Sequence, residues 1–326
     1  MKARASHPPH PVLLADIGGT NARFAVLADG AMSAVAHMAV SDYRDFNAAL
    51  GAYLGGLADA GRIRSAILAA SGAVRDNCCA LTNNDWVIDA AALRSAYRLS
   101  SVRLINDFEA VAWSLRRLSP DRLLALGGQV PSAEAPCAAL GPGTGLGMAV
   151  SIPHAAGQIV LSSEGGHASI AGGSLREDAV IAHLRQRYGH VSAERVLSGR
   201  GLENLYAALA ALDGVAVPER RAADVMQTGI EGSCAVSRAA VDMFCAMLGS
   251  VAGNLALTFG AKGGVYIGGG ILRRVPDYLA RSEFRARFED KGRFRKYLAP
   301  IPAWLILDED AAFVGLRALA EVDAIG

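Results

Sequence analysis

A glycine-rich turn follows the first apolar run of the chain. Residues 12–17 (VLLADI) contain an aspartate near their end and lead into Gly-Gly-Thr-Asn. Glycines let a backbone approach an anion closely, threonine and asparagine add hydrogen-bonding side chains, and the aspartate could hold Mg²⁺ directly or through water. The candidate phosphate-binding residues are Asp16, Gly18, Gly19, Thr20 and Asn21. Because the same residues favour a hairpin, the turn alone leaves phosphate binding and a plain turn open.

Two further glycine-rich turns also follow apolar runs. Residues 141–147 (GPGTGLG) hold four glycines in seven positions, and three successive glycines follow residues 263–267. A backbone with so few side chains can pack closely on a ligand. The candidate nucleotide-binding residues are Gly143, Thr144, Gly145, Gly268, Gly269 and Gly270. The chain has neither the Gly-Lys pair of a P-loop nor G-x-G-x-x-G. Three glycine turns at strand ends therefore fit a phosphate-bearing nucleotide that is held from two sides.

The pair Asn106-Asp107 lies between a predicted strand and a predicted helix. Asparagine and aspartate are both favoured at helix N-caps, so capping alone could explain them. A carboxylate fixed at a helix start is also well oriented to take a proton from a substrate hydroxyl. These residues therefore predict a cap, a general base at Asp107, or both.

A carboxylate and an imidazole are separated by two glycines in Glu164-Gly165-Gly166-His167. E-x-x-H on a helix can bind iron, but the glycines disfavour a helix and no second E-x-x-H occurs. In a loop, Glu164 and His167 can exchange hydrogen bonds with the hydroxyl groups of a sugar. We therefore expect recognition of a neutral polyol and no metal here.

Glu194 lies in the segment 190–199 (HVSAERVLSG), where Ser192 resembles a helix N-cap. A glutamate in the first turn of a helix is favoured by the helix dipole. The residues by themselves therefore indicate a surface role for Glu194.

The elements that would position these residues alternate along the chain, which predicts an α/β fold. The expected strands are 12–17, 22–28, 31–40, 65–70, 102–105, 137–141, 146–152, 158–163, 263–268 and 303–307. The expected helices are 45–60, 89–97, 108–118, 174–188, 192–197, 201–212, 234–260 and 309–322. The charge-free run 243–261 is long enough to span a membrane, but it contains three glycines and an asparagine. We expect it to be a buried helix and the protein not to bind membranes.

Composition limits the functional classes further. A chain of 326 residues suggests about two domains. The 32 Lys and Arg residues nearly balance the 31 Asp and Glu residues, which argues against a nucleic-acid-binding protein. The five cysteines show no C-x-x-C spacing, which is typical of reduced thiols in a cytoplasmic protein. Residues 1–11 lack the apolar stretch of a signal peptide, so we expect a flexible N-terminal arm there.

The ordered set of motifs resembles bacterial ATP-dependent glucokinases. The matching strings are DIGGTNARFA, INDFEAVA, LGPGTGLG, SSEGGH, HVSAERVLSGRGLENLY and FEDKGRFRKYL, which cover nearly the whole chain after the arm. The resemblance implies a two-domain actin-like ATPase (ribonuclease H-like) fold with an interdomain cleft. It further implies a small domain of residues 12–117 and 308–326 and a large domain of residues 118–307.

The resemblance also assigns roles to the candidate residues. It implies that Asn106, Asp107, Glu164, His167 and Glu194 bind glucose and that Asp107 is the general base, which replaces the surface role of Glu194. It implies that the first two glycine turns face the phosphates of ATP, that the third lies near the adenosine, and that Asp16 positions Mg²⁺ through water. A cytoplasmic homodimer without structural zinc is expected. The family often has proline where this chain has Arg200, which could alter that loop.

Other functions fit some of the same residues. A kinase for mannose, glucosamine or N-acetylglucosamine would need a similar site, because sugar specificity depends on fine details of pocket shape. A non-catalytic sugar-sensing regulator on the same fold would usually carry an N-terminal helix-turn-helix, and only about eleven residues precede the first expected strand. An ATPase without a sugar substrate would not need the EGGH loop.

Overall fold

The computed structural model describes residues 10–82, 84–155 and 157–323. The chain divides into two compact units: the first is Met1–Leu118 with Glu309–Gly326, and the second is Ser119–Asp308. Each unit is built around a six-stranded sheet, so the predicted α/β class is confirmed. The domain limits expected from the sequence, 117 and 308, stay a prediction.

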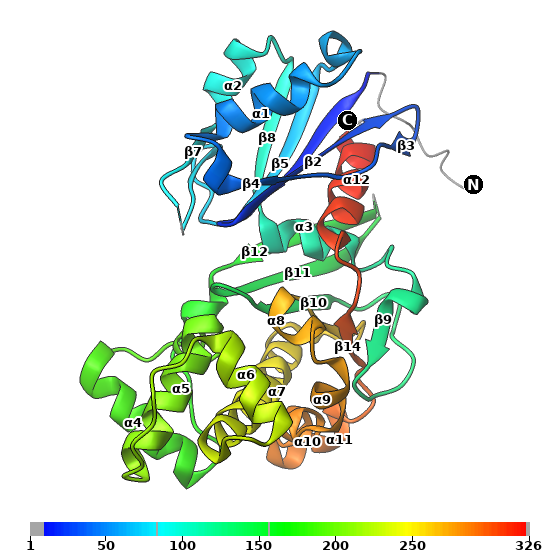
Figure 1. Ribbon diagram of the computed structural model, residues 1–326. Helices are drawn as coiled ribbons and strands as arrows, with labels where there is room; N and C mark the ends of the chain where they lie inside the picture. The colour runs from blue at the N-terminus through cyan, green and yellow to red at the C-terminus, as the bar shows by residue number, and fades with distance from the viewer. Residues whose placement is uncertain (1–9, 83, 156, 324–326) are drawn as a thin grey trace. The chain divides into compact units, whose positions relative to one another are not determined.

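The sheet of the first unit has the strand order β3-β2-β1-β5-β8, and β4 also pairs with β2 (Figure 1). Its strands are β1 (Val12–Ile17), β2 (Asn21–Ala28), β3 (Ala31–Met32), β4 (Ala36–Ala39), β5 (Ser65–Ala70) and β8 (Ser101–Asn106). β1 is antiparallel to β2 and parallel to β5, which is parallel to β8. Ile17, Ala70 and Asn106 are aligned in this register. The first glycine turn and Asn106-Asp107 therefore leave the same edge of the sheet.

Helices and a small hairpin complete the first unit. The helices are α1 (Phe46–Gly55), α2 (Ala90–Ala96), α3 (Asp107–Ser114) and α12 (Ala311–Asp323), and the hairpin strands are β6 (Cys78–Ala80) and β7 (Val87–Asp89). Phe46 and Leu50 of α1 share a buried cluster with Leu13 and Phe24 of the sheet. α12 packs against α3, β1 and β5. The helix α12 thus packs in the same unit as β1 and β5, although it lies about 200 residues after α3 in the chain.

The sheet of the second unit has the order β12-β11-β10-β13-β14-β9. Its strands are β9 (Leu123–Ala125), β10 (Cys137–Pro142), β11 (Leu146–His154), β12 (Gly157–Ser163), β13 (Val265–Ile267) and β14 (Ala303–Ile306). β10 is antiparallel to β11 and parallel to β13. This repeats the arrangement of β1, β2 and β5, so the second glycine turn occupies the place in its sheet that the first occupies in the other.

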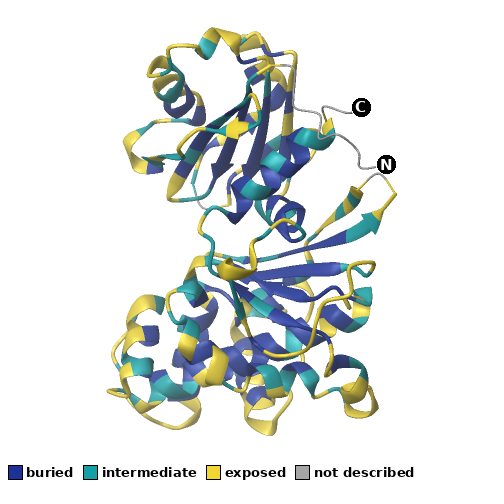
Figure 2. Ribbon diagram, turned by 90° about the vertical axis from the view of Figure 1, so that its right-hand side faces the viewer, coloured by how far each residue is buried: buried dark blue, intermediate teal, exposed yellow. Residues whose placement is uncertain are grey.

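The helices of the second unit lie mainly between β12 and β14 in the sequence. They are α4 (Leu175–Tyr188), α5 (Gly199–Leu212), α6 (Ala222–Glu231), α7 (Ala235–Phe259), α8 (Gly270–Arg273), α9 (Pro276–Arg281), α10 (Phe284–Glu289) and α11 (Arg295–Leu298). Figure 2 shows buried strands and helix faces in this unit and exposed outer surfaces. The buried helix expected at 243–261 is confirmed, because 72% of the residues in the most apolar stretch of α7 are buried. At Gly249 an added Cβ would lie 2.1 Å from the Phe284 carbonyl oxygen, so α10 packs directly on its backbone.

Several expected elements differ from those observed. The expected helix 45–60 ends at Gly55, and the helix expected at 192–197 is only a 3₁₀ turn, Ala193–Arg195. The expected strand 31–40 is two short strands with a break. The helices α6 and α8 to α11 were not expected from the sequence. In α8 to α11, one or two turns give too few residues to show helical periodicity.

The contact between α3 and α12 depends on a glycine. A Cβ at Gly315 would lie 1.8 Å from the carbonyl oxygen of Ala110. We expect Gly315→Ala to lower the free energy of unfolding by about 1–3 kcal/mol, the usual cost of overpacking a core. A lower urea midpoint would show this effect. At Gly55, in α1 of the same unit, a Cβ meets no atom within 4 Å of the described chain. Gly55→Ala should therefore be neutral or stabilising, and equal losses in both variants would contradict the prediction.

Candidate functional site

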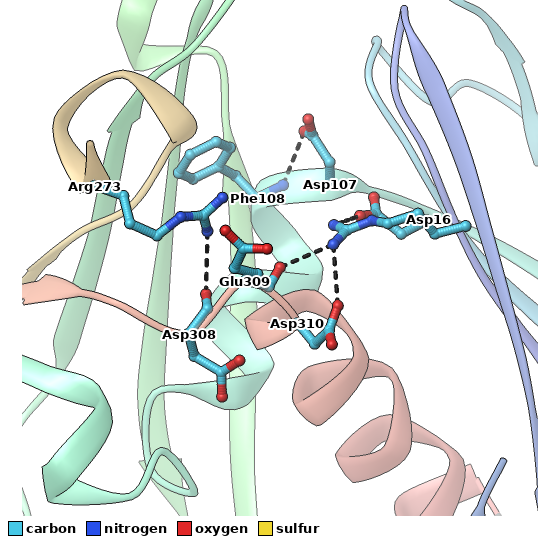
Figure 3. A network of polar contacts seen from close by, with 8 residues as sticks. Asp16, Asp107, Phe108, Arg273, Asp308, Glu309 and Asp310 are labelled. Atoms are coloured by element: carbon cyan, nitrogen blue, oxygen red, sulfur yellow. Dashed lines mark hydrogen bonds and ion pairs between the residues drawn. The ribbon is translucent and has the colours of Figure 1, made fainter. Parts of the chain in front are cut away.

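Asp16 is paired with an arginine across the first hairpin. The antiparallel register places Arg23 of β2 directly opposite Asp16 of β1, and the two side chains form an ion pair. The guanidinium also donates to the Glu309 carbonyl oxygen at 2.8 Å and to Asp310 Oδ1 at 3.2 Å (Figure 3). Arg23 thus ties the first glycine turn to the start of α12. Arg23 was not among the residues expected at the site, although pairing the two strands about their turn would have placed it beside Asp16.

The first glycine turn is compact and open to solvent. The Gly18 amide donates to the Asn21 carbonyl at 2.9 Å, which closes the hairpin. Thr20 and Asn21 are exposed at its tip. A plain hairpin turn and a phosphate-binding turn are therefore compatible here, since the residues that close the turn leave the side chains at its tip accessible.

Asn106 and Asp107 form the start of α3. Asn106 Oδ1 accepts from the Phe108 amide at 2.9 Å, which confirms the predicted cap, and its Nδ2 donates to the Gly72 carbonyl at 3.2 Å. Asp107 Oδ1 also accepts from the Phe108 amide, at 2.9 Å (Figure 3). Both side chains are half-buried. The carboxylate of Asp107 is thus oriented by the helix start, as a general base requires.

A buried thiol lies behind this segment. Cys79 of β6 packs against Gly72, where a Cβ would lie 2.8 Å from Sγ. Burial, together with the nearby Cys78 and Asp107, raises the pKa of Cys79 to about 11. The thiol therefore stays protonated at neutral pH and adds no second negative charge near Asp107.

In the second unit, His167 lies between two carboxylates. Its Nε2 is 3.8 Å from Glu164 Oε2, and its Nδ1 is 3.9 Å from Glu194 Oε1. Glu164 follows β12, and Glu194 lies on the 3₁₀ turn Ala193–Arg195. The Ala193 amide donates to the Ala168 carbonyl at 2.9 Å, which holds the two segments together. The gaps are too long for direct hydrogen bonds, so hydroxyl groups of a ligand could bridge these side chains.

The surface role indicated for Glu194 by its local sequence is wrong. Its side chain is only 30% exposed, and Oε2 accepts from the Leu146 amide at 3.0 Å. Ser192 makes no capping hydrogen bond, and the true cap is Ser198, whose Oγ accepts from the Gly201 amide. The sequence could not show this, because the partner of Glu194 lies 48 residues away in the chain.

The second and third glycine turns lie side by side. The Gly143 amide donates to the Gly145 carbonyl at 2.8 Å within the second turn, and Thr144 is exposed at its tip. The Gly268 amide donates to the Leu140 carbonyl at 2.8 Å. Gly269 has φ +91°, and a Cβ there would lie 2.3 Å from the Pro142 carbonyl oxygen. Glycine at 269 is thus required by the fold itself.

Asp16 suits magnesium through water better than direct ligation. Its carboxylate is paired with Arg23, which a directly bound ion would have to displace. No group of three or more His, Cys, Asp or Glu able to hold a metal occurs among the described residues. Mg²⁺ commonly keeps several waters and binds one or two carboxylates together with substrate phosphates. The residues present therefore fit an ion brought by a nucleotide.

Comparisons with known proteins agree on one family. A family model described as glucokinase matches residues 13–322. The glucokinase of Paramagnetospirillum magneticum is 46% identical over 94% of this chain and 97% of its own. The crystal structure of a glucokinase from an Antarctic psychrotroph superposes with a TM-score of 0.85 at 34% identity, covering 95% of this chain and 98% of that one.

A more distant structure shows the same fold. A ROK family glucokinase from Streptomyces griseus, in complex with glucose and AMPPNP, has a TM-score of 0.62 at 20% identity and covers 95% of this chain and 98% of its own. The predicted actin-like ATPase fold is confirmed by these neighbours.

The pairing of Arg23 with Asp16 should contribute to stability. The two side chains are 20% and 12% exposed, so Arg23→Ala leaves a largely buried carboxylate without its partner. We expect a loss of about 1–3 kcal/mol in the free energy of unfolding. Arg44→Ala is the control, because the pair of Arg44 with Asp45 is exposed and should contribute less than about 1 kcal/mol. Urea unfolding measures both, and equal effects would refute a special role for Arg23.

Proposed function

This chain belongs to the glucokinase family and is therefore an enzyme that phosphorylates glucose with ATP. We propose that Asp107 is the general base of this reaction and that the 6-hydroxyl of the sugar is the acceptor. The observation that carries the proposal is the placement of Asp107 in the first turn of α3, directly after β8. Asn106 beside it is fixed by hydrogen bonds to the Phe108 amide and the Gly72 carbonyl. Asn106 and Asp107 bind the sugar in this proposal.

The remaining sugar ligands are Glu164, His167 and Glu194. Their spacing of 3.8–3.9 Å around one imidazole supports this assignment, because each gap can be bridged by a hydroxyl that donates to a carboxylate. These side chains fix the orientation of the sugar ring.

The nucleotide is bound by the three glycine turns. Two observations support this assignment. Gly269 packs on Pro142, which aligns the second and third turns, and Thr20 and Thr144 are exposed. The phosphates contact Asp16, Gly18, Gly19, Thr20 and Asn21 of the first turn and Gly143, Thr144 and Gly145 of the second. The adenosine lies near Gly268, Gly269 and Gly270. Mg²⁺ held through water by Asp16 would offset negative charge on the transferring group.

The chemistry is an in-line displacement at phosphorus. Asp107 accepts the proton of the 6-hydroxyl as that oxygen forms a bond to the γ-phosphorus. The bond from the γ-phosphorus to the bridging oxygen breaks, and ADP leaves. Turn amides stabilise the charge on the transferring phosphoryl group. We further propose a cytoplasmic homodimer, for which the support is family membership alone.

Replacing the base should strongly reduce turnover without weakening the binding of the sugar. Asp107→Asn retains the shape and the hydrogen bond to Phe108 but cannot accept the proton, so kcat should fall by more than about 10²-fold. A coupled assay of ADP release with glucose, mannose, glucosamine and N-acetylglucosamine measures this, and glucose should be the preferred acceptor. Glu109→Gln, which removes a charge from the same helical turn, is the control. Near wild-type kcat for Asp107→Asn, or no glucose-dependent ADP release by the wild type, would refute the proposal.

Changes to the carboxylate–imidazole group should affect sugar binding. Glu164→Gln and His167→Ala each remove a partner for a sugar hydroxyl, so the KM for glucose should rise by roughly tenfold, in line with a lost hydrogen bond to a charged or buried group. His37→Ala, at an exposed position on β4, should leave this KM unchanged. If neither site variant changes the KM for glucose, the two residues are not sugar ligands.

A further inference from the structure

The two carboxylate oxygens of Glu194 face different parts of the second unit. Oε1 is 3.9 Å from His167 Nδ1, on the side of the proposed sugar ligands. Oε2 accepts from the Leu146 amide at 3.0 Å. Leu146 is the first residue of β11 and directly follows the turn Gly143–Gly145. One carboxylate is therefore shared between the sugar side and the nucleotide turn.

The turn makes room for this carboxylate at one glycine. A Cβ at Gly145 would lie 2.6 Å from Glu194 Oε2, and the backbone there is not in the left-handed region. Apart from the two residues that flank Gly145 in the chain, Glu194 alone among the described residues lies within 4 Å of that Cβ position. A Cβ at Gly143 meets no described atom within 4 Å. An alanine at 145 would thus displace the Glu194 carboxylate, whereas an alanine at 143 would meet no such neighbour.

The segment that carries Glu194 is also joined to the turn through its backbone. The Gly199 amide donates to the Gly143 carbonyl at 2.9 Å. Ser198 Oγ donates to the Glu194 carbonyl at 2.9 Å and caps α5. Glu194 and the turn are therefore held as one assembly, with the carboxylate as its contact on the sugar side.

We propose that Glu194 couples glucose binding to nucleotide binding through the Leu146 amide. The inference rests on the proposed function. A glucose hydroxyl that donates to Oε1 fixes the carboxylate, which in turn fixes the amide at the end of the phosphate turn. A nucleotide that orders the turn presents Oε1 to the sugar. Since coupling between two sites is reciprocal, each ligand raises the affinity of the other by the same factor.

The first test measures glucose affinity by calorimetry with no nucleotide present. Gly145→Ala displaces the Glu194 carboxylate, so glucose should lose a hydrogen bond to a charged group and bind roughly 5-fold or more weakly. Gly143→Ala, in the same turn, should leave glucose affinity unchanged. Unchanged affinity in Gly145→Ala, or an equal loss in both variants, would overturn the proposal. Circular dichroism confirms that each variant is folded.

The second test is the reverse and does not depend on the glycine variants. It measures the affinity for AMPPNP with Mg²⁺ without glucose and again at saturating glucose. In the wild type, glucose should raise this affinity roughly 5-fold or more. In Glu194→Ala the effect of glucose should be lost, whereas Glu164→Ala, at another proposed sugar ligand, should retain it at saturating glucose. An equal effect of glucose in the two variants would overturn the coupling.

The outcomes also separate this inference from the proposed function. If Glu194→Ala binds glucose as the wild type does, Glu194 is not a sugar ligand and the assignment under the proposed function fails. If Glu194→Ala loses glucose affinity but Gly145→Ala and the effect of glucose on nucleotide binding are unaffected, only the coupling fails. In the Glu194→Ala background, Gly145→Ala should have no further effect, because the clash is with the deleted carboxylate.

Discussion

Parallel pairing of strands is the constraint on which the placement of the candidate residues depends. In the first unit, β1, β5 and β8 run in the same direction, so the glycine turn and the start of α3 leave one sheet edge. In the second unit, β10 and β13 are also parallel, so the second and third glycine turns leave the same end of that sheet. In the first unit, the turn after β1 and the start of α3 are thereby brought to the same end of the sheet, with β5 between their strands, and in the second unit the two turns are brought to the ends of neighbouring strands. Loops at such an edge are the usual location of ligand sites in α/β proteins.

The glycines of these turns serve the protein as well as a ligand. Gly269 has φ +91° and packs on the Pro142 carbonyl, so a side chain there would disrupt the fold whatever the ligand. Gly145 provides space for a glutamate, while Gly143 and Gly270 face open space. Close approach to a ligand is therefore needed to explain only some of these glycines, such as Gly143 and Gly270.

Much of the fold could be predicted from local patterns, and less of the site could be. Strands such as 12–17 and 137–141 are largely apolar runs and were found at or within one residue of their limits. The cap at Asn106 was also predictable, because it uses the next residues in the chain. Arg23 and the second contact of Glu194 were missed, since they depend on cross-strand register and on a partner 48 residues away. The Mg²⁺ site and the homodimer stay predictions.

Arg23 pairs with Asp310 and so joins the second strand to the start of α12, a helix that the ribosome makes only after residues 119–308. α12 begins at Ala311 and covers β1, β5 and α3 with side chains such as Phe313, Leu316 and Leu319, each 0% exposed. During synthesis the strands of the first sheet therefore emerge early but lack this cover until residues 119–308, which form a continuous unit, have been made. Folding from the N-terminus, the common order for multidomain chains, is thus unavailable to the first unit. Premature termination near residue 308 would leave a complete second unit attached to an uncovered apolar sheet, a species prone to aggregation and to capture by chaperones.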